Sequence, residues 1–259
     1  MMDKTIGFIG GGRVTRIILE GFKRKNVSFK EVIVSDSNPE ALKLLKETFL
    51  DITVAPDNNP LSASGHIVFI ALHPPAVLPV LDEIRSSLKQ EAVLISLAPK
   101  IAISKISERL EGFKKIVRMI PNACSIVNHG FNPMAFSPSL DQSEKKDLLK
   151  ILALLGECPE VDEDKLEAYA IVAAMGPTYL WFQLYELEKI GMSLGLTSQE
   201  VRSAVTRMAE GAAMTMSESE LLPDEVMNLI PVKPLAEEEE RIKSLYRSKL
   251  EGLYNKLKS

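Results

Sequence analysis

The feature that most constrains the fold is a short apolar segment that ends in three glycines and runs directly into a helical pattern. It lies near the start of the chain and reads Lys4-Thr5-Ile6-Gly7-Phe8-Ile9-Gly10-Gly11-Gly12-Arg13-Val14-Thr15. A strand, a glycine turn and a helix in this order open a dinucleotide-binding βαβ unit. In such a unit Gly10 permits the tight turn, and Gly12 lets the backbone approach a pyrophosphate at the positive end of the helix. Thr15 stands at the third small position, where glycine or alanine is usual, so the fingerprint is incomplete.

Strand-like and helical patterns alternate through the first 160 residues. The predicted strands cover residues 5–9, 31–35, 67–71, 92–97 and 115–120. The predicted helices between them cover residues 14–25, 39–49, 75–88 and 103–110. Apolar strands that alternate with amphipathic helices predict a doubly wound parallel sheet, so the expected fold class is α/β of the Rossmann type.

Strand patterns stop at about residue 160, and long helical patterns follow. After one more helix over residues 143–155, helices are predicted over residues 164–174, 178–194, 198–218 and 237–257. Thr197, followed three residues later by Glu200, predicts a capped helix start. The expected division is a Rossmann domain over residues 1–160 and a helical domain over residues 161–259.

Composition narrows the class of protein. The 259 residues are 46% hydrophobic and 25% charged, with a net charge of −4, which gives no basic excess for nucleic acid. No apolar run approaches the roughly 20 residues of a membrane span, and no secretion signal is expected. Cys124 and Cys158 are then expected to be reduced thiols in a cytoplasmic protein. The three histidines lack metal-ligand spacing, so no metal site is expected.

Several short motifs follow one another along most of the chain. They lie at residues 7–12 (GFIGGG), 71–74 (ALHP), 96–98 (SLA), 117–122 (VRMIPN), 176–179 (GPTY), 191–196 (GMSLGL) and 211–213 (GAA). In order and spacing they resemble the motifs G-F-I-G-x-G, A-V-K-P, S-I-A-A-G, V-R-x-M-P-N, S-G-S-G-P-A-Y, G-x-x-L-G-L and G-A-A. These belong to the pyrroline-5-carboxylate reductase family, which makes proline from a cyclic imine.

The resemblance implies that NAD or NADP binds at the ends of the predicted strands. The residues that it places at the cofactor are Ile9, Gly10, Gly11, Gly12, Arg13, Val14, Ser35, Asp36, Asn58, Ala71, Leu72, His73, Pro74, Leu97 and Ala98. Asp36 can accept ribose hydroxyls and would repel a 2′-phosphate, which favours NAD. The hydroxyls of Ser35 and Ser37 can bind a phosphate, so the choice between NAD and NADP stays open.

The resemblance also implies residues on the substrate side. Asn122 would orient nicotinamide or substrate, Glu163 matches a family glutamate near the substrate, and Thr178 lies at a helix break that faces it. Two of them have structural alternatives: Asn122 as an ordinary turn residue after proline, and Glu163 as a helix-start acid. Because family members pair their helical domains, a homodimer or larger homo-oligomer is implied.

One family signature is missing. The loop S-P-G-G-T-T, which holds the substrate carboxylate and ring nitrogen, is expected near residues 230–238, where this chain reads IPVKPLAEE. No glycine, serine or threonine occurs from Leu229 through Lys243, so no shift of alignment restores the loop. Lys233 is a candidate replacement partner for the carboxylate, with a solvated surface lysine as the alternative. S-G-S-G-P has likewise become residues 173–177 (AAMGP), without the serines.

Three functions are compatible with these residues. The first is NAD(P)H-dependent reduction of a cyclic imine, above all 1-pyrroline-5-carboxylate, which needs no strong general acid because a protonated imine is already activated. The second is a same-fold oxidoreductase with a different, less polar substrate. The third is an NAD(P)-binding regulatory protein without turnover. No lysine occurs between Lys165 and Lys189, which argues against β-hydroxyacid dehydrogenase chemistry, because those related enzymes use a lysine on the interdomain helix.

Overall fold

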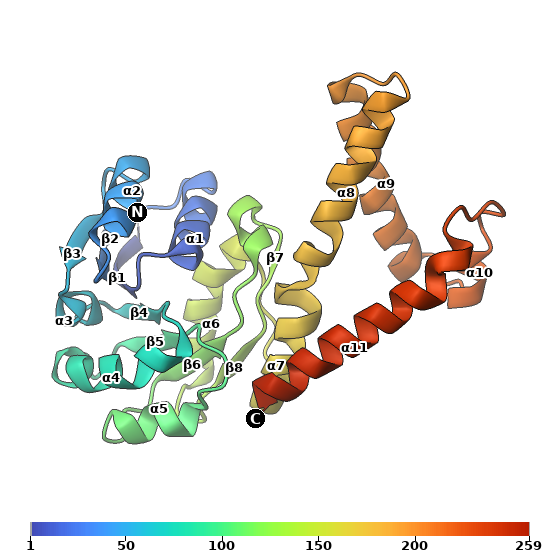
Figure 1. Cartoon of the computed structure of the whole chain (residues 1–259). Coiled ribbons are helices and arrows are strands. Elements are labelled where there is room, and N and C mark those ends of the chain that lie inside the picture. Colours follow the sequence, from blue (N-terminus) through green and yellow to red (C-terminus); the bar gives the residue numbers. More distant parts are fainter. Residues whose placement is uncertain (1, 259) are drawn as a thin grey trace. The chain divides into compact units, whose positions relative to one another are not determined.

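The computed structural model describes residues 2–258, which form two compact units. The first unit contains residues 2–175 together with 254–258, and the second contains residues 176–253. All strands of the described chain belong to the first unit, and helices build the second (Figure 1). The predicted fold class, a Rossmann-type sheet followed by a helical region, is therefore confirmed.

The first unit is built on a seven-stranded sheet with the order β3-β2-β1-β4-β5-β6-β8. Its strands are β1 (Met2–Ile9), β2 (Phe29–Asp36), β3 (Thr53–Pro56), β4 (Ile67–Ile70), β5 (Val93–Ser96), β6 (Ile116–Met119) and β8 (Met134–Phe136). All but β8 run parallel, in the order of a dinucleotide-binding sheet. The strand order reverses between β1 and β4, and ligands of open α/β sheets bind at the carboxyl ends beside such a point.

The short strands depart from the sequence prediction. β8 pairs antiparallel with β6, so the sheet is not purely parallel. β7 (Gly130–Phe131) and β9 (Gly156–Glu157) form a separate two-stranded sheet. The strands that the sequence patterns missed are β3, β7, β8 and β9. Each has only two to four residues, which is too few to show a strand period.

Helices cover both faces of the large sheet (Figure 1). One face carries α1 (Arg13–Arg24), α2 (Pro39–Thr48) and α6 (Gln142–Leu152); the other carries α3 (Asn59–Ala63), α4 (Pro74–Ile84), α5 (Ile103–Arg109) and α7 (Leu166–Tyr169). Side chains cap three of these helices: Asn38 accepts the Glu40 N–H before α2, Asn58 accepts the Leu61 N–H before α3, and Asp141 with Glu144 forms a capping box before α6. Because helices cover both faces of the sheet, the side chains on both sides of the central strands are buried, and these strands are therefore continuous apolar runs.

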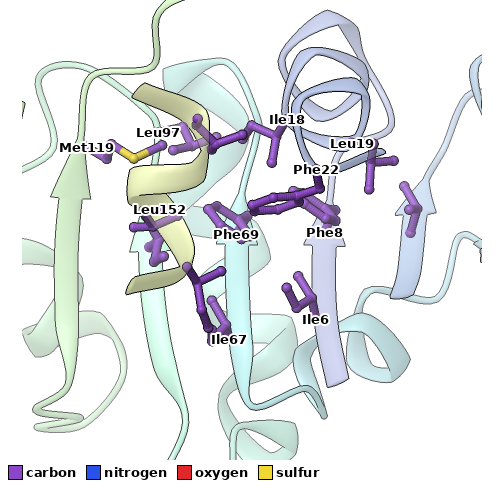
Figure 2. Packing of buried hydrophobic residues seen from close by; sticks show 14 of the residues in the cluster. Ile6, Phe8, Ile18, Leu19, Phe22, Ile67, Phe69, Leu97, Met119 and Leu152 are labelled. Carbon is purple, nitrogen blue, oxygen red and sulfur yellow. The ribbon is translucent and has the colours of Figure 1, made fainter. Parts of the chain in front are cut away.

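The core between the sheet and α1 is aromatic. Figure 2 shows Phe8 and Phe69 on neighbouring strands, with Ile18 and Phe22 of α1 packed on them. The two rings stack with centroids 4.7 Å apart. All four side chains are buried, and each such side chain stabilises the fold by roughly 1.5–3 kcal/mol relative to an exposed one. This packing holds α1 on the face of the sheet at β1 and β4.

The first unit ends in a helical segment of changing geometry. A 3₁₀ turn (Glu163–Lys165) leads into α7 and then into a π-helical turn (Ala170–Ala174). Leu166 and Ala170 pack into the second core layer with β4 to β6 and α5. π-Helical turns are rare and occur frequently at functional sites. The segment is thus held on the sheet by buried apolar side chains.

The second unit has a small core of its own. It contains α8 (Gly176–Ser193), α9 (Ser198–Glu218), α10 (Pro223–Met227) and most of α11 (Glu239–Lys258). The predicted cap of α9 is confirmed, because Thr197 Oγ1 accepts the Glu200 N–H at 3.3 Å. Among its described apolar side chains, only that of Val201 is buried. The unit therefore presents much apolar surface that it does not cover itself.

Candidate functional site

The glycine loop after β1 has the geometry of a tight turn. Gly10 has φ +106°, a left-handed conformation that glycine adopts at no steric cost, and a Cβ there would lie 2.4 Å from the Ala71 carbonyl oxygen. The Gly10 N–H donates to the Ser35 carbonyl oxygen at 2.8 Å. Thr15 completes the turn, because its buried hydroxyl donates to the Gly10 carbonyl oxygen at 2.5 Å. The residue that made the fingerprint incomplete thus stabilises the loop through its side chain.

Asp36 joins the end of β2 to this loop. One carboxylate oxygen accepts the Gly11 N–H at 2.7 Å, and the other accepts the Asn38 N–H at 2.7 Å. Both are charge-assisted hydrogen bonds, which are the stronger kind. Asp36 therefore orders the glycine loop and also places a negative charge beside it.

Open space lies in front of the loop at the start of α1. A Cβ built on Gly12 meets no atom within 4 Å, and α1 begins at Arg13, which is exposed, with Val14 next. The first N–H groups of a helix have no partners within the helix and favour an anionic ligand. A backbone cradle of this kind, open where a side chain would fill it, fits the pyrophosphate of a dinucleotide.

The predicted cofactor residues of β2 and the following loop have structural partners. The buried Ser35 hydroxyl donates to Asn59 Oδ1 at 2.9 Å. Asn58 Oδ1 accepts the Leu61 N–H at 3.2 Å and caps α3. Ser35 therefore points toward α3, and its hydroxyl is poorly placed to bind a phosphate in solvent.

The remaining predicted cofactor residues follow β1, β4 and β5 and lie side by side. The Ala71 N–H donates to the carbonyl oxygen of buried Ile9 at 2.8 Å, and the Leu97 N–H donates to that of Ile70 at 3.0 Å. The neighbours of these residues at the same edge are Leu72, His73, Pro74 and Ala98. His73 is exposed and precedes α4, which begins at Pro74, whereas Ala98 is buried. The structure thus brings the sequence-predicted cofactor residues to one edge of the sheet.

Asn122 is buried, and its amide joins β6 to the π-helical turn. Its Nδ2 donates to the Ala173 carbonyl oxygen, and its Oδ1 accepts the Cys124 N–H, both at 2.9 Å. Its backbone N–H donates to Asn132 Oδ1 at 2.9 Å. These contacts give Asn122 the role of holding the π-helical turn at the carboxyl edge.

Glu163 belongs to an ionic cluster that the sequence analysis did not foresee. Arg118 on β6 is 3% exposed, and its guanidinium donates to Glu163 Oε1 at 3.1 Å and to Glu167 Oε1 at 2.6 Å. The same glutamate oxygens accept the N–H groups of Ile103, at 2.7 Å, and of Lys100, at 3.1 Å. The cluster therefore ties the loop between β5 and α5 to the segment at α7. The sequence offered one signal for this cluster, which is an arginine inside an apolar strand. A buried charge usually has an ionic partner.

The charge of Glu167 depends on this cluster. Burial raises the pKa of the Glu167 carboxyl, but the hydrogen bond and the charge of Arg118, with the Lys100 N–H, outweigh burial and lower it below 4.5. Glu167 is consequently an anion at neutral pH. It acts as an acceptor in the cluster and is unsuited to donate a proton.

Thr178 and Lys233 belong to the second unit. Thr178 is exposed in the first turn of α8. Lys233 is exposed between α10 and α11, and its ammonium donates to Asn228 Oδ1 at 3.1 Å. The segment around Lys233 has the prolines and apolar residues of the sequence prediction in place of a glycine-threonine loop.

Residues 2–258 lack the features of several other types of site. No group of three or more histidine, cysteine, aspartate or glutamate side chains there could hold a metal ion. No helix in the same range has the length and apolar character needed to cross a membrane. Both cysteines are free, and burial raises the pKa of the Cys158 thiol to about 11 against a hydrogen bond with Asn132. Cys158 is therefore not a thiolate nucleophile at neutral pH.

The chain is similar to known oxidoreductases. A family model described as NADP oxidoreductase coenzyme F420-dependent matches residues 5–100. Pyrroline-5-carboxylate reductase of Corynebacterium melassecola is 25% identical over 86% of this chain and 83% of its own length. The enzyme of that name from Escherichia coli is 24% identical over 88% of this chain and 85% of its own length.

Solved structures agree with the fold. The crystal structure of Plasmodium falciparum pyrroline carboxylate reductase with NADP bound has a TM-score of 0.84 and 20% identity, and covers 100% of this chain and 98% of its own. The Streptococcus pyogenes 1-pyrroline-5-carboxylate reductase has a TM-score of 0.76 at 20% identity, over 99% of this chain and 98% of its own.

Fold, glycine cradle and comparisons together define an NAD(P)-dependent oxidoreductase of the Rossmann class. Within that class, the chain is similar to pyrroline-5-carboxylate reductases along most of its length. It differs from the family pattern in one respect, because the S-P-G-G-T-T loop is absent from its sequence.

Proposed function

We propose that this chain reduces 1-pyrroline-5-carboxylate to proline with NAD(P)H and so serves proline biosynthesis. The observation that carries the proposal is the match to curated pyrroline-5-carboxylate reductases along 86% of the chain, combined with a glycine cradle that is open at Gly12. Free, partly buried cysteines suit a reducing compartment, and we propose the cytoplasm.

The reaction requires no strong general acid from the protein's side chains. The bound dinucleotide would supply a hydride to the imine carbon, whose nitrogen already carries a proton near neutral pH. The chain has to bind the two reactants, orient them and exclude water. Asn122 and the Arg118 cluster would contribute by holding the carboxyl edge rigid.

We propose that residues 1–160 bind the cofactor and that residues 161–259 serve dimerisation and substrate binding. The first set comprises Ile9, Gly10, Gly11, Gly12, Arg13, Val14, Ser35, Asp36, Asn58, Ala71, Leu72, His73, Pro74, Leu97 and Ala98. The substrate-side set comprises Asn122, Glu163, Thr178 and Lys233. Within it, Asn122 and Glu163 would act by positioning backbone, because both already bind backbone groups.

We expect NADH to be preferred to NADPH. The Asp36 carboxylate lies at the carboxyl end of β2, where the adenosine ribose binds in this fold, and it would repel a 2′-phosphate. The Ser35 hydroxyl is occupied by Asn59. The ratio of the two dissociation constants should favour NADH by about 10- to 100-fold, measured by fluorescence titration.

Asp36→Ser should bring this ratio close to one. The substitution also loosens the Gly11 loop, which weakens both cofactors equally and leaves the ratio unaffected. Ser37→Ala, which alters an exposed hydroxyl beside Asp36, is the matched control and should keep the preference for NADH. A wild-type preference for NADPH would contradict the proposed role of Asp36.

We expect weak turnover of 1-pyrroline-5-carboxylate. The missing loop removes hydrogen bonds worth roughly 0.5–1.5 kcal/mol each, and more where the partner is charged. Two or three unreplaced losses would raise the substrate Michaelis constant by about one to three powers of ten over that of a relative with the loop. A spectrophotometric assay with NADH and NADPH in parallel measures this, and Lys233→Ala should reduce the activity further.

The outcomes of this assay separate the three functions. Efficient turnover that Lys233→Ala leaves intact would show that the loss of the loop has no consequence. Turnover of an apolar imine or ketone only would indicate the different, less polar substrate that the missing loop favours. Saturable NADH binding without any turnover would identify a regulatory protein.

We propose that the protein is at least a homodimer through its helical residues. Large apolar side chains are exposed on α8, among them Phe182 at 68% and Tyr185 at 62%. Apolar surface of this extent on a unit with one buried apolar side chain favours a partner, and a second copy is the usual one. Light scattering at micromolar concentration should give at least twice the chain mass of 28.6 kDa.

Phe182→Glu should shift the assembly toward monomer, because a carboxylate at an apolar interface is costly to desolvate. Leu50→Glu is the matched control, since Leu50 in the first unit is equally apolar and 75% exposed. It should leave the mass unchanged. A monomeric wild-type protein would rule out the proposed dimer.

A further inference from the structure

Lys100 has a backbone conformation that lysine rarely adopts. Its φ is +72°, in the left-handed region where residues with a side chain lose roughly 1–2 kcal/mol. It follows Ser96-Leu97-Ala98-Pro99, which places it where the family motif S-I-A-A-G has its glycine. Glycine would adopt this backbone conformation without the steric cost. A lysine at such a strained position indicates that its side chain has a function.

Buried ionic groups impose this conformation. The Lys100 N–H donates to Glu167 Oε1 at 3.1 Å, and the Arg118 guanidinium binds the same oxygen at 2.6 Å. Arg118 and Glu167 are both buried, so the Glu167 oxygen that accepts the Lys100 N–H is held in a fixed position. The loop therefore keeps Lys100 in place despite its unfavourable φ.

The location of Lys100 suits a ligand contact. It is the first exposed residue after β5, and Leu97 and Ala98 before it are buried at the cofactor edge of the sheet. Within residues 2–258 its ammonium makes neither a hydrogen bond nor an ion pair, whereas Lys105 in the next helix pairs with Glu108. An unpaired cation at the carboxyl edge of an open α/β sheet lies where such folds bind their ligands.

We propose that the Lys100 ammonium binds the carboxylate of the imine substrate. The inference rests on the proposed function, in which the substrate carries a carboxylate that has lost its family loop. Lysine suits this role because its flexible stem carries a compact cation with three donors. The contact would come from the cofactor-binding unit and would make the protein selective for anionic imines.

The test compares two imines that differ in the carboxylate: 1-pyrroline-5-carboxylate and 1-pyrroline. Lys100→Gly removes the ammonium and suits the left-handed backbone, so it should raise Tm by roughly 2–4 °C. It should also reduce the ratio of the two kcat/KM values by about 10- to 100-fold, which is the worth of a charged hydrogen bond. Lys100→Arg should retain most of the ratio, and Lys105→Ala, the matched surface control, should retain all of it.

A binding measurement makes the result independent of turnover. Calorimetric titration of L-proline into the NAD⁺-loaded protein should show about tenfold or greater weakening in Lys100→Gly, with unchanged affinity for NAD⁺. An unchanged substrate ratio or unchanged L-proline affinity would overturn the role of Lys100 and leave the proposed function standing. A wild-type protein that reduces neither imine but binds L-proline through Lys100 would overturn the proposed function alone. Failure of the wild type in both measurements would overturn both.

Discussion

Gly12→Val is expected to reduce NADH affinity by at least about 100-fold while leaving the fold intact. A Cβ at Gly12 meets no atom within 4 Å, and its φ of −81° suits a residue with a side chain. A Cβ at this position therefore adds no clash within the protein. The valine side chain would fill the space in which a pyrophosphate approaches the backbone. Calorimetric titration with NADH, together with a thermal melt, separates the two effects.

Gly10→Ala is the contrasting variant in the same loop. Its Cβ would lie 2.4 Å from the Ala71 carbonyl oxygen, and its φ is +106°. We expect it to lower the free energy of unfolding by roughly 1–3 kcal/mol. Gly12→Val with wild-type NADH affinity would mean that the glycine turn is only structural.

The sequence predicted the glycine turn after β1 because local rules determine its backbone geometry. The glycines after β1 and the acid after β2 each serve a backbone geometry that the motif itself encodes. Thr15 was read as a departure from the motif. Its hydroxyl bonds the Gly10 carbonyl oxygen, a compensation that no spacing rule contains.

The other side depended on contacts between residues far apart in the sequence. Glu163 and Asn122 were predicted as substrate residues, and their roles stay predictions, yet both hold backbone groups about 50 residues away or more: Glu163 that of Ile103, and Asn122 that of Ala173. Which atoms a carboxylate or amide reaches is decided by packing, so the pattern alone gave only a list of polar candidates. The strand bearing Arg118 was predicted, but its ionic partners were not.

Arg118→Met is expected to lower the free energy of unfolding by about 3–5 kcal/mol, the cost of leaving a buried charge without its partner. Methionine retains much of the side-chain volume, so the loss reports on charge more than on a cavity. Glu167 would then be a buried carboxylate with only backbone N–H groups as donors, among them that of Lys100. Urea denaturation of the wild type and the variant at neutral pH measures the difference.

The double variant Arg118→Met with Glu167→Gln is the matched control. It removes the orphaned charge and keeps an amide oxygen that can accept the Lys100 N–H. Part of the lost stability should return, because replacing a buried ion pair as a whole costs far less than breaking it. Equal loss in the single and the double variant would locate the effect in packing and not in charge.

The dependence on pH provides a further check on the same cluster. In the wild type the folded pKa of Glu167 lies below its unfolded value, so its contribution is full above about pH 4.5 and is lost as the pH falls through the folded pKa. In Arg118→Met burial and the backbone N–H groups of Lys100 and Glu167 remain, and because burial is the largest of these causes we expect the folded pKa of Glu167 to rise above the unfolded value. The free energy of unfolding of the variant is then lowered at neutral pH, and part of this loss is recovered on acidification. The gap between the two stabilities should narrow from about pH 7 to about pH 5, and a gap independent of pH would contradict the charge-based account.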